Sequence, residues 1–61
     1  MTVAEALRAA TVRLRAGGID SAPRDARLLL AEAIGCPPDR LTLLAHEALD
    51  AAAADTFDAM L

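Results

Sequence analysis

Two clusters of helix-breaking residues divide this 61-residue chain into short segments. Gly17 and Gly18 separate a first amphipathic stretch from a second, and Gly35 with Pro37 and Pro38 ends the second. Glycine accepts the left-handed conformation that follows a helix C-terminus, and proline cannot continue a helix. Strand signals, such as period-2 alternation, are missing. The sequence therefore predicts an all-α fold, a small bundle of four to five short helices.

The first stretch begins with a helix-capping pattern. Thr2 and Glu5 have the spacing of a capping box, in which each side chain accepts a hydrogen bond from the other residue's amide. Glu5 and Arg8 are three residues apart and can pair weakly. Val12 is an exception to the pattern because it lies among charged residues. The apolar stripe itself consists of Val3, Ala6, Leu7, Ala10 and Leu14.

A second helix is expected from Ala22 to Ile34. Ser21 is its candidate N-cap, and Pro23 suits a first turn, where amides need no helical partner. Leu28 lies off the apolar face, on the side of Asp25. That face consists of Ala22, Ala26, Leu29, Leu30, Ala33 and Ile34.

The remaining residues predict two further short helices. One runs from Asp39 to Ala45, and its Leu41, Leu43 and Leu44 are expected to face the core. Asp50 can cap the other, which keeps an i, i+4, i+7, i+8 apolar pattern at Ala53, Phe57, Met60 and Leu61. Because the chain stops within this stripe without a C-cap, we expect residues 1–61 to be one domain of a longer protein, cut within its last helix. The alternative is a complete short protein with a frayed end.

Composition narrows the possible functions. The net charge is −3, but residues 1–27 carry +2 and residues 28–61 carry −5. An acidic chain without a concentrated basic stretch argues against nucleic acid as the main partner. No apolar run could span a membrane, and the start lacks the features of a signal peptide, so we expect a cytoplasmic protein. Abundant Ala and Arg without Lys indicate a GC-rich, bacterial genome.

Residues that could carry chemistry are few. Cys36 and His46 are the only residues of their types, so no metal-ligand spacing exists. Cys36 is expected to be a small apolar filler, and His46 to lie near a helix C-terminus. The run from Gly18 to Ser21 is similar to the G-x-D-S site of acyl carrier proteins, but Ala22-Pro23 follows it where carriers have Leu or Met. We therefore predict no catalytic, cofactor-binding or metal-binding residue.

The order of these segments resembles the N-terminal domain of the HemK/PrmC family. These are S-adenosylmethionine-dependent methyltransferases that modify the glutamine of the Gly-Gly-Gln motif in class 1 peptide chain release factors. Ala22 stands where the family commonly has Pro, and Pro23 follows one place later. The similar stretches are the opening helix Val3 to Arg8, Ser21 to Leu30 (family pattern S-P-R-x-D-A-x-x-L-L), Ala33-Ile34-Gly35, and Asp39 to Leu44 (D/S-R-x-x-L-L).

The resemblance implies a helical domain that precedes a Rossmann-like catalytic domain. The family's glycine-rich cofactor loop and Asn-Pro-Pro-Tyr motif do not occur in these 61 residues, so S-adenosylmethionine is assigned to the parent enzyme and not to this segment. Implied partners are a class 1 release factor and the protein's own catalytic domain, without direct nucleic acid, membrane or metal.

Four residues are candidates for partner contact. Val12 and Leu28 are apolar residues outside their helices' stripes, and Arg24 and Arg27 can provide charged recognition. Alternatively, Val12 and Leu28 pack on a neighbouring helix or on the catalytic domain. Two other functions stay open at this point. One is a free-standing helical protein-interaction module, and the other is an acyl-carrier-like protein.

Overall fold

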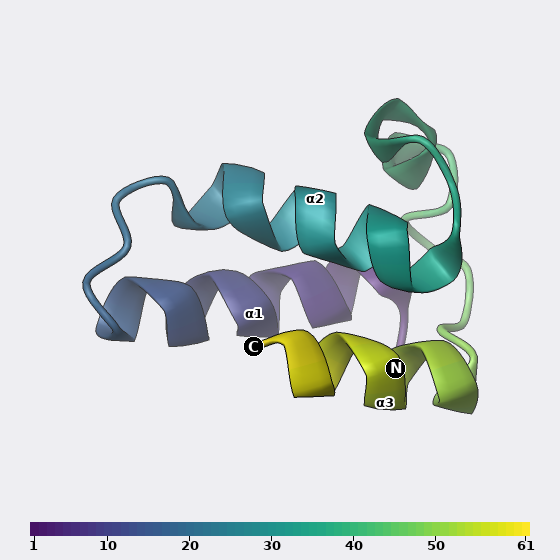
Figure 1. Ribbon diagram of the computed structural model, residues 1–61. Helices are drawn as coiled ribbons and strands as arrows, with labels where there is room; N and C mark the ends of the chain where they lie inside the picture. Colours follow the sequence, from purple (N-terminus) through teal and green to yellow (C-terminus); the bar gives the residue numbers. More distant parts are fainter.

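The computed structural model covers all 61 residues. It contains three α-helices and one short 3-10 helix, and no β-strand (Figure 1). Helix α1 spans Val3–Ala16, α2 spans Ala22–Ile34, η1 is the 3-10 helix Pro38–Thr42, and α3 spans Ala51–Met60. The all-α prediction is confirmed. Four to five helices were expected, and the structure has three α-helices and the 3-10 helix η1. None of them is long and apolar enough to cross a lipid bilayer.

Helix α2 is the central element of the bundle. It packs along α1 and also contacts η1 and α3, whereas α1 and α3 approach each other less closely (Figure 1). Five of the nine buried residues are alanines, and Leu30 is the largest side chain that is fully buried. Alanine favours the helical conformation and lets helix axes come close. The nine are Val3, Ala6, Ala10, Ala22, Ala26, Leu30, Ala31, Leu41 and Phe57.

The start of α1 carries the capping box that its sequence predicted. The Glu5 amide donates to Thr2 Oγ1 at 3.2 Å, and the Thr2 amide donates to Glu5 Oε1 at 2.8 Å. The hydrogen bond from the Thr2 amide, and then that of the Thr2 side chain, hold the pKa of the Glu5 carboxyl below its ordinary value. Arg8 adds only a weak long-range attraction, because the expected Glu5–Arg8 ion pair does not form.

Backbone hydrogen bonds tie the start of α1 to the segment that precedes α3. The Val3 and Ala4 amides donate to the carbonyls of Glu47 and Ala45, both at 3.0 Å, and the Leu49 amide donates to the Met1 carbonyl at 2.8 Å. Amides in the first turn of a helix have no partner within the helix. The segment 45–49 supplies these partners, and α1 in turn fixes its course.

This pairing explains why the short helix predicted from Asp39 to Ala45 is confirmed only in part, as the 3-10 helix η1. The 3-10 helix η1 ends at Thr42, and turns lead from there into the segment that pairs with α1. Leu41 is buried as expected and Leu44 is half-buried, but Leu43 is 78% exposed and does not face the core. His46 accordingly lies exposed in a turn, rather than near the C-terminus of a helix as expected.

The helix ends follow the glycines, with two corrections at the caps. Gly18 and Gly35 have φ of +86°, whereas Gly17 has φ of −82°. Helix α2 has the predicted bounds. The Ser21 hydroxyl, however, donates to Asp25 Oδ2 at 3.0 Å and does not cap an amide. Asp50 also makes no side-chain cap to α3. Both residues occupy the N-cap position by backbone geometry alone.

Candidate partner-binding surface

All four candidate contact residues lie on the surface. Val12 is 67% exposed on α1, and Leu28 is 45% exposed on α2. Arg24 and Arg27 are exposed on the first half of α2. Neither of the two apolar side chains is among the residues that pack against the core cluster of the bundle. Contact with a partner stays a prediction for all four.

The structure separates these candidates between two surfaces. Val12 and Arg27 share a shallow groove between α1 and α2, which we call the arginine groove. Leu28 lines a second groove, described below, and Arg24 lines neither of the two. The residues that line the arginine groove are Leu7, Arg8, Thr11, Val12, Arg15, Pro23 and Arg27.

Helical spacing places two further arginines beside Val12. Arg8, Val12 and Arg15 follow an i, i+4, i+7 pattern and share one side of α1. Arg27 reaches the same groove from α2. Sequence reasoning missed Arg8 and Arg15 as candidates, although their spacing with Val12 was a usable signal. Their proximity to Arg27 depends on how α2 packs on α1, which the sequence pattern does not specify.

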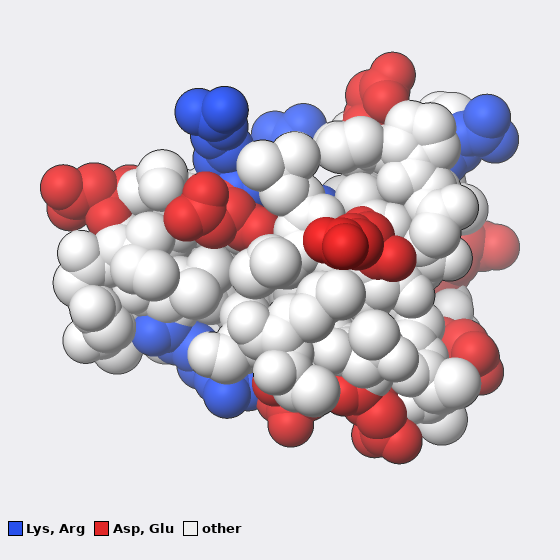
Figure 2. All heavy atoms as spheres, viewed as in Figure 1, with Lys and Arg blue, Asp and Glu red and all other residues white.

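Leu28 belongs to a second groove, which we call the apolar groove. It lies where the α1–α2 connection meets the end of α3, and Asp25 is its only charged residue. Because the other lining residues are apolar, large apolar side chains lie together at the surface. Ile19 among them is 38% exposed. On the face shown in Figure 2, uncharged atoms form a broad central area, and no continuous basic surface is visible. The apolar groove is lined by Leu14, Ile19, Asp25, Leu28, Leu29, Met60 and Leu61.

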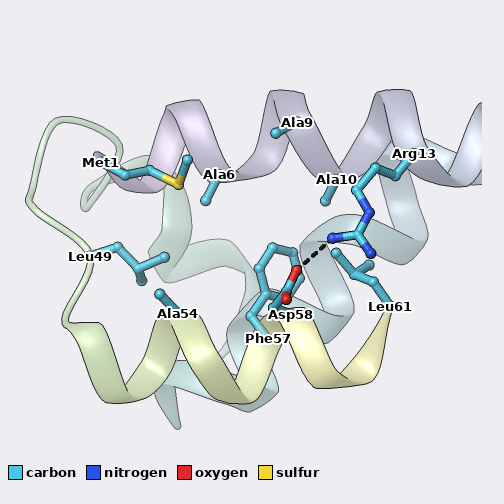
Figure 3. A pocket seen from close by; sticks show the side chains of 10 residues that line it. All are labelled: Met1, Ala6, Ala9, Ala10, Arg13, Leu49, Ala54, Phe57, Asp58 and Leu61. Carbon is cyan, nitrogen blue, oxygen red and sulfur yellow. Dashed lines mark hydrogen bonds and ion pairs between the residues drawn. The ribbon is translucent and has the colours of Figure 1, made fainter.

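A third groove runs between α1 and α3 (Figure 3). Short alanine side chains of α1 face Phe57 and Leu49 across it, and an ion pair from Arg13 to Asp58, with an Nη1–Oδ1 distance of 2.6 Å, crosses at one side. The groove exists because the alanines on α1 are too short to fill the space towards α3. We interpret it as incomplete packing at the edge of the bundle.

Cys36 and His46 are not brought together in a reactive group. Cys36 is a free, half-buried cysteine that packs against the core, as expected of a small apolar filler. His46 is exposed in its turn. No group of three or more His, Cys, Asp or Glu side chains is placed to hold a metal ion. What the structure does present is two surface grooves, one lined in part by arginine side chains and the other mainly by apolar side chains.

The fold defines a small all-α domain with these grooves on its surface. Residues 5–61 match the PrmC N-terminal domain, and the chain belongs to this family. Over all 61 residues the chain is 54% identical to the release factor glutamine methyltransferase of Cereibacter sphaeroides, and it spans 22% of the length of that relative. No solved structure matches it significantly. The family resemblance noted in the sequence is thus confirmed.

Proposed function

We propose that this chain is the substrate-recognition domain of a methyltransferase that modifies the glutamine of the Gly-Gly-Gln motif in class 1 release factors. The observation that carries the proposal is the 54% identity, over the whole chain, to a release factor glutamine methyltransferase. Since the chain spans 22% of that relative, we assign the catalytic domain and S-adenosylmethionine to the rest of a longer protein. The proposal places that enzyme in the bacterial cytoplasm.

The contribution of such a domain is to position the substrate. Contacts remote from the reacting atom hold a substrate in the geometry that reaction requires, and so convert binding energy into rate. The arginine groove and the apolar groove lie on different surfaces and share no lining residue. The domain can therefore contact a release factor and its own catalytic domain at the same time. It needs no nucleic acid, membrane or metal partner of its own for this role.

The test uses the full-length gene product with Val12→Asp or Leu28→Asp. Either change places a charge on an exposed apolar contact, and we expect the KM for the release factor to rise while circular dichroism shows the helices intact. Leu43→Asp is the matched control, because Leu43 is 78% exposed and lines neither groove. The proposal is wrong if both variants stay folded and keep the KM of the control.

Reading the gene beyond Leu61 provides an independent check. Roughly 150 further residues, about one domain, should contain a glycine-rich loop after a strand and then Asn-Pro-Pro-Tyr. A stop codon directly after Leu61 would exclude the methyltransferase and favour a free-standing interaction module instead.

A further inference from the structure

The arginine groove has a charge opposite to that of the molecule as a whole. Arg8, Arg15 and Arg27 line it and no acidic residue does, although the chain carries nine acidic residues and a net charge of −3. Two of the three come from α1 and one from α2, so the packing of the two helices assembles the cluster. The fold thus produces a concentrated basic site that the linear sequence does not show.

None of these three arginines forms an ion pair within the domain. The only ion pair in the structure joins Arg13 to Asp58, on the other side of α1. Like charges that gather without counter-charges repel one another, and a partner that supplies carboxylates removes this repulsion. The guanidinium group also matches a carboxylate in geometry, because it can donate two parallel hydrogen bonds.

We infer that the arginine groove binds an acidic protein surface of the release factor, with Val12 contacting an apolar side chain between the carboxylates. This inference rests on the proposed function and identifies the chemistry of the partner at one of its surfaces. Val12 lies between Arg8 and Arg15 along α1 and is 67% exposed, so an apolar contact is flanked by charged ones. Interfaces commonly place charged contacts around an apolar centre, where they steer encounter and set specificity.

The same features favour protein over RNA as the occupant. Proteins that bind single-stranded RNA combine basic residues with aromatic side chains on which the bases stack. The only aromatic residue of this chain is Phe57, which is buried and does not line the groove. The chain also has no lysine, and its acidic residues outnumber its arginines by nine to six.

The experiment compares charge-reversal variants of the full-length methyltransferase. Arg8→Glu combined with Arg15→Glu should raise the KM for the release factor about tenfold, or about 1.4 kcal/mol, and leave kcat at saturating release factor unchanged. Arg40→Glu is the matched control, because Arg40 is exposed on η1, outside the groove, and should leave KM within about twofold. If the double variant loses helical content, Arg27→Glu on α2 replaces it. This single change should raise the KM for the release factor by a smaller factor.

Salt dependence distinguishes an electrostatic contact from a structural one. Raising the ionic strength from about 0.01 M to about 0.15 M shortens the Debye length from about 30 Å to about 8 Å. The KM of the wild-type enzyme should rise over this range, and that of the double variant should rise less. A general loss of structure would not reduce the salt dependence in this way.

The outcomes separate this inference from the proposed function. If the wild-type enzyme methylates the release factor but the groove variants keep the KM of Arg40→Glu, the inference is wrong and the proposed function stands. If the wild-type enzyme does not methylate it, both are wrong. Fluorescence anisotropy with a labelled single-stranded RNA tests the other occupant. RNA binding that the groove variants abolish, together with an unchanged KM for the release factor, would also overturn the inference.

Discussion

The pairing of α1 with α2 differs in kind from the attachment of α3. Seven of the nine buried residues belong to α1 and α2, and five of these seven are alanines that let the two helices lie close together. Helix α3 contributes one buried residue, Phe57. The first two helices therefore form the stable unit of the domain, and α3 is an edge element held largely by one side chain.

The space beside α3 shows the consequence of this difference. Between α1 and α3 the alanines leave the groove seen in Figure 3, which the exposed Arg13–Asp58 ion pair crosses. A domain of about 60 residues buries only about 60% of its unfolded surface, so it has little stability to lose. Regions with few buried apolar contacts open first. We expect α3 to open before α1 and α2 separate.

Leu30→Ala should have the largest effect, because it removes the largest fully buried side chain from the central helix. A substitution of this kind costs about 2–5 kcal/mol, and a domain of this size has about 3–9 kcal/mol in total. Urea unfolding followed by circular dichroism should show the variant largely unfolded. Leu43→Ala, at an exposed leucine, should leave the midpoint unchanged. If Phe57→Ala lost more free energy of unfolding than Leu30→Ala, α3 rather than the α1–α2 pair would be the more strongly packed region.

Phe57→Ala should come second and act first on α3. One side of the ring faces the groove rather than packed atoms, so we expect a loss of about 3 kcal/mol, at the lower end of the range for such substitutions. Amide hydrogen exchange should show α3 losing protection while α1 and α2 keep theirs. Equal loss of protection in all three helices would mean that α3 is not a separate edge element.

Gly18→Ala should destabilise the connection between α1 and α2. Gly18 has φ of +86°, and a left-handed conformation costs a residue with a side chain about 1–2 kcal/mol. Gly17→Ala is the control at the adjacent position, where φ is −82° and an added Cβ would lie 3.5 Å from the nearest atom. The control should be neutral or slightly stabilising in thermal unfolding. Equal losses at both positions would show that backbone conformation is not the cause.

The Arg13–Asp58 ion pair should contribute little, although it directly joins the two regions. Its side chains are 54% and 73% exposed, and exposed pairs contribute about 0.2–1 kcal/mol. A double-mutant cycle with Arg13→Ala and Asp58→Ala should give a coupling near the lower end of this range, and added salt should abolish it. A salt-independent coupling above that range would mean that α3 is anchored by charge as well as by Phe57.

Sequence patterns predicted the α1–α2 region better than the rest, for a physical reason. The capping box of Thr2 and Glu5 and the bounds of α2 depend on interactions within a few residues, which local spacing reveals. The segment 45–49 instead takes its course from hydrogen bonds to the start of α1, more than 40 residues earlier in the chain. Local periodicity therefore predicted a helix from Asp39 to Ala45 where the structure has η1 and turns.

The candidate surface shows the same division. The positions of Val12 and Leu28 outside their helices' apolar stripes followed from spacing on single helices, and both residues are exposed. The arginine groove was missed, because Arg27 joins Arg8 and Arg15 only through the packing of α2 on α1. Neither net charge nor spacing along one helix predicts a cluster that two helices build together.

The smallest effect concerns Glu5, where the α1–α2 unit meets the segment that leads to α3. Hydrogen bonding from Thr2 lowers the pKa of the Glu5 carboxyl in the folded chain, so ionised Glu5 stabilises the fold above the ordinary carboxyl pKa. That contribution is lost as the pH falls through the lowered pKa. Glu5→Gln keeps an acceptor for the Thr2 amide but does not titrate.

Between about pH 6 and about pH 3, the wild-type chain should therefore lose more stability than Glu5→Gln, as measured by thermal unfolding at each pH. Parallel losses would show that the cap acts through hydrogen bonding alone and that the charge on Glu5 is immaterial. An NMR titration of the Glu5 carboxyl, with its midpoint below that of an unperturbed glutamate, identifies the group responsible. Because the Val3 and Ala4 amides bond to the carbonyls of Glu47 and Ala45, acid should also loosen the segment before α3 while the α1–α2 interface persists.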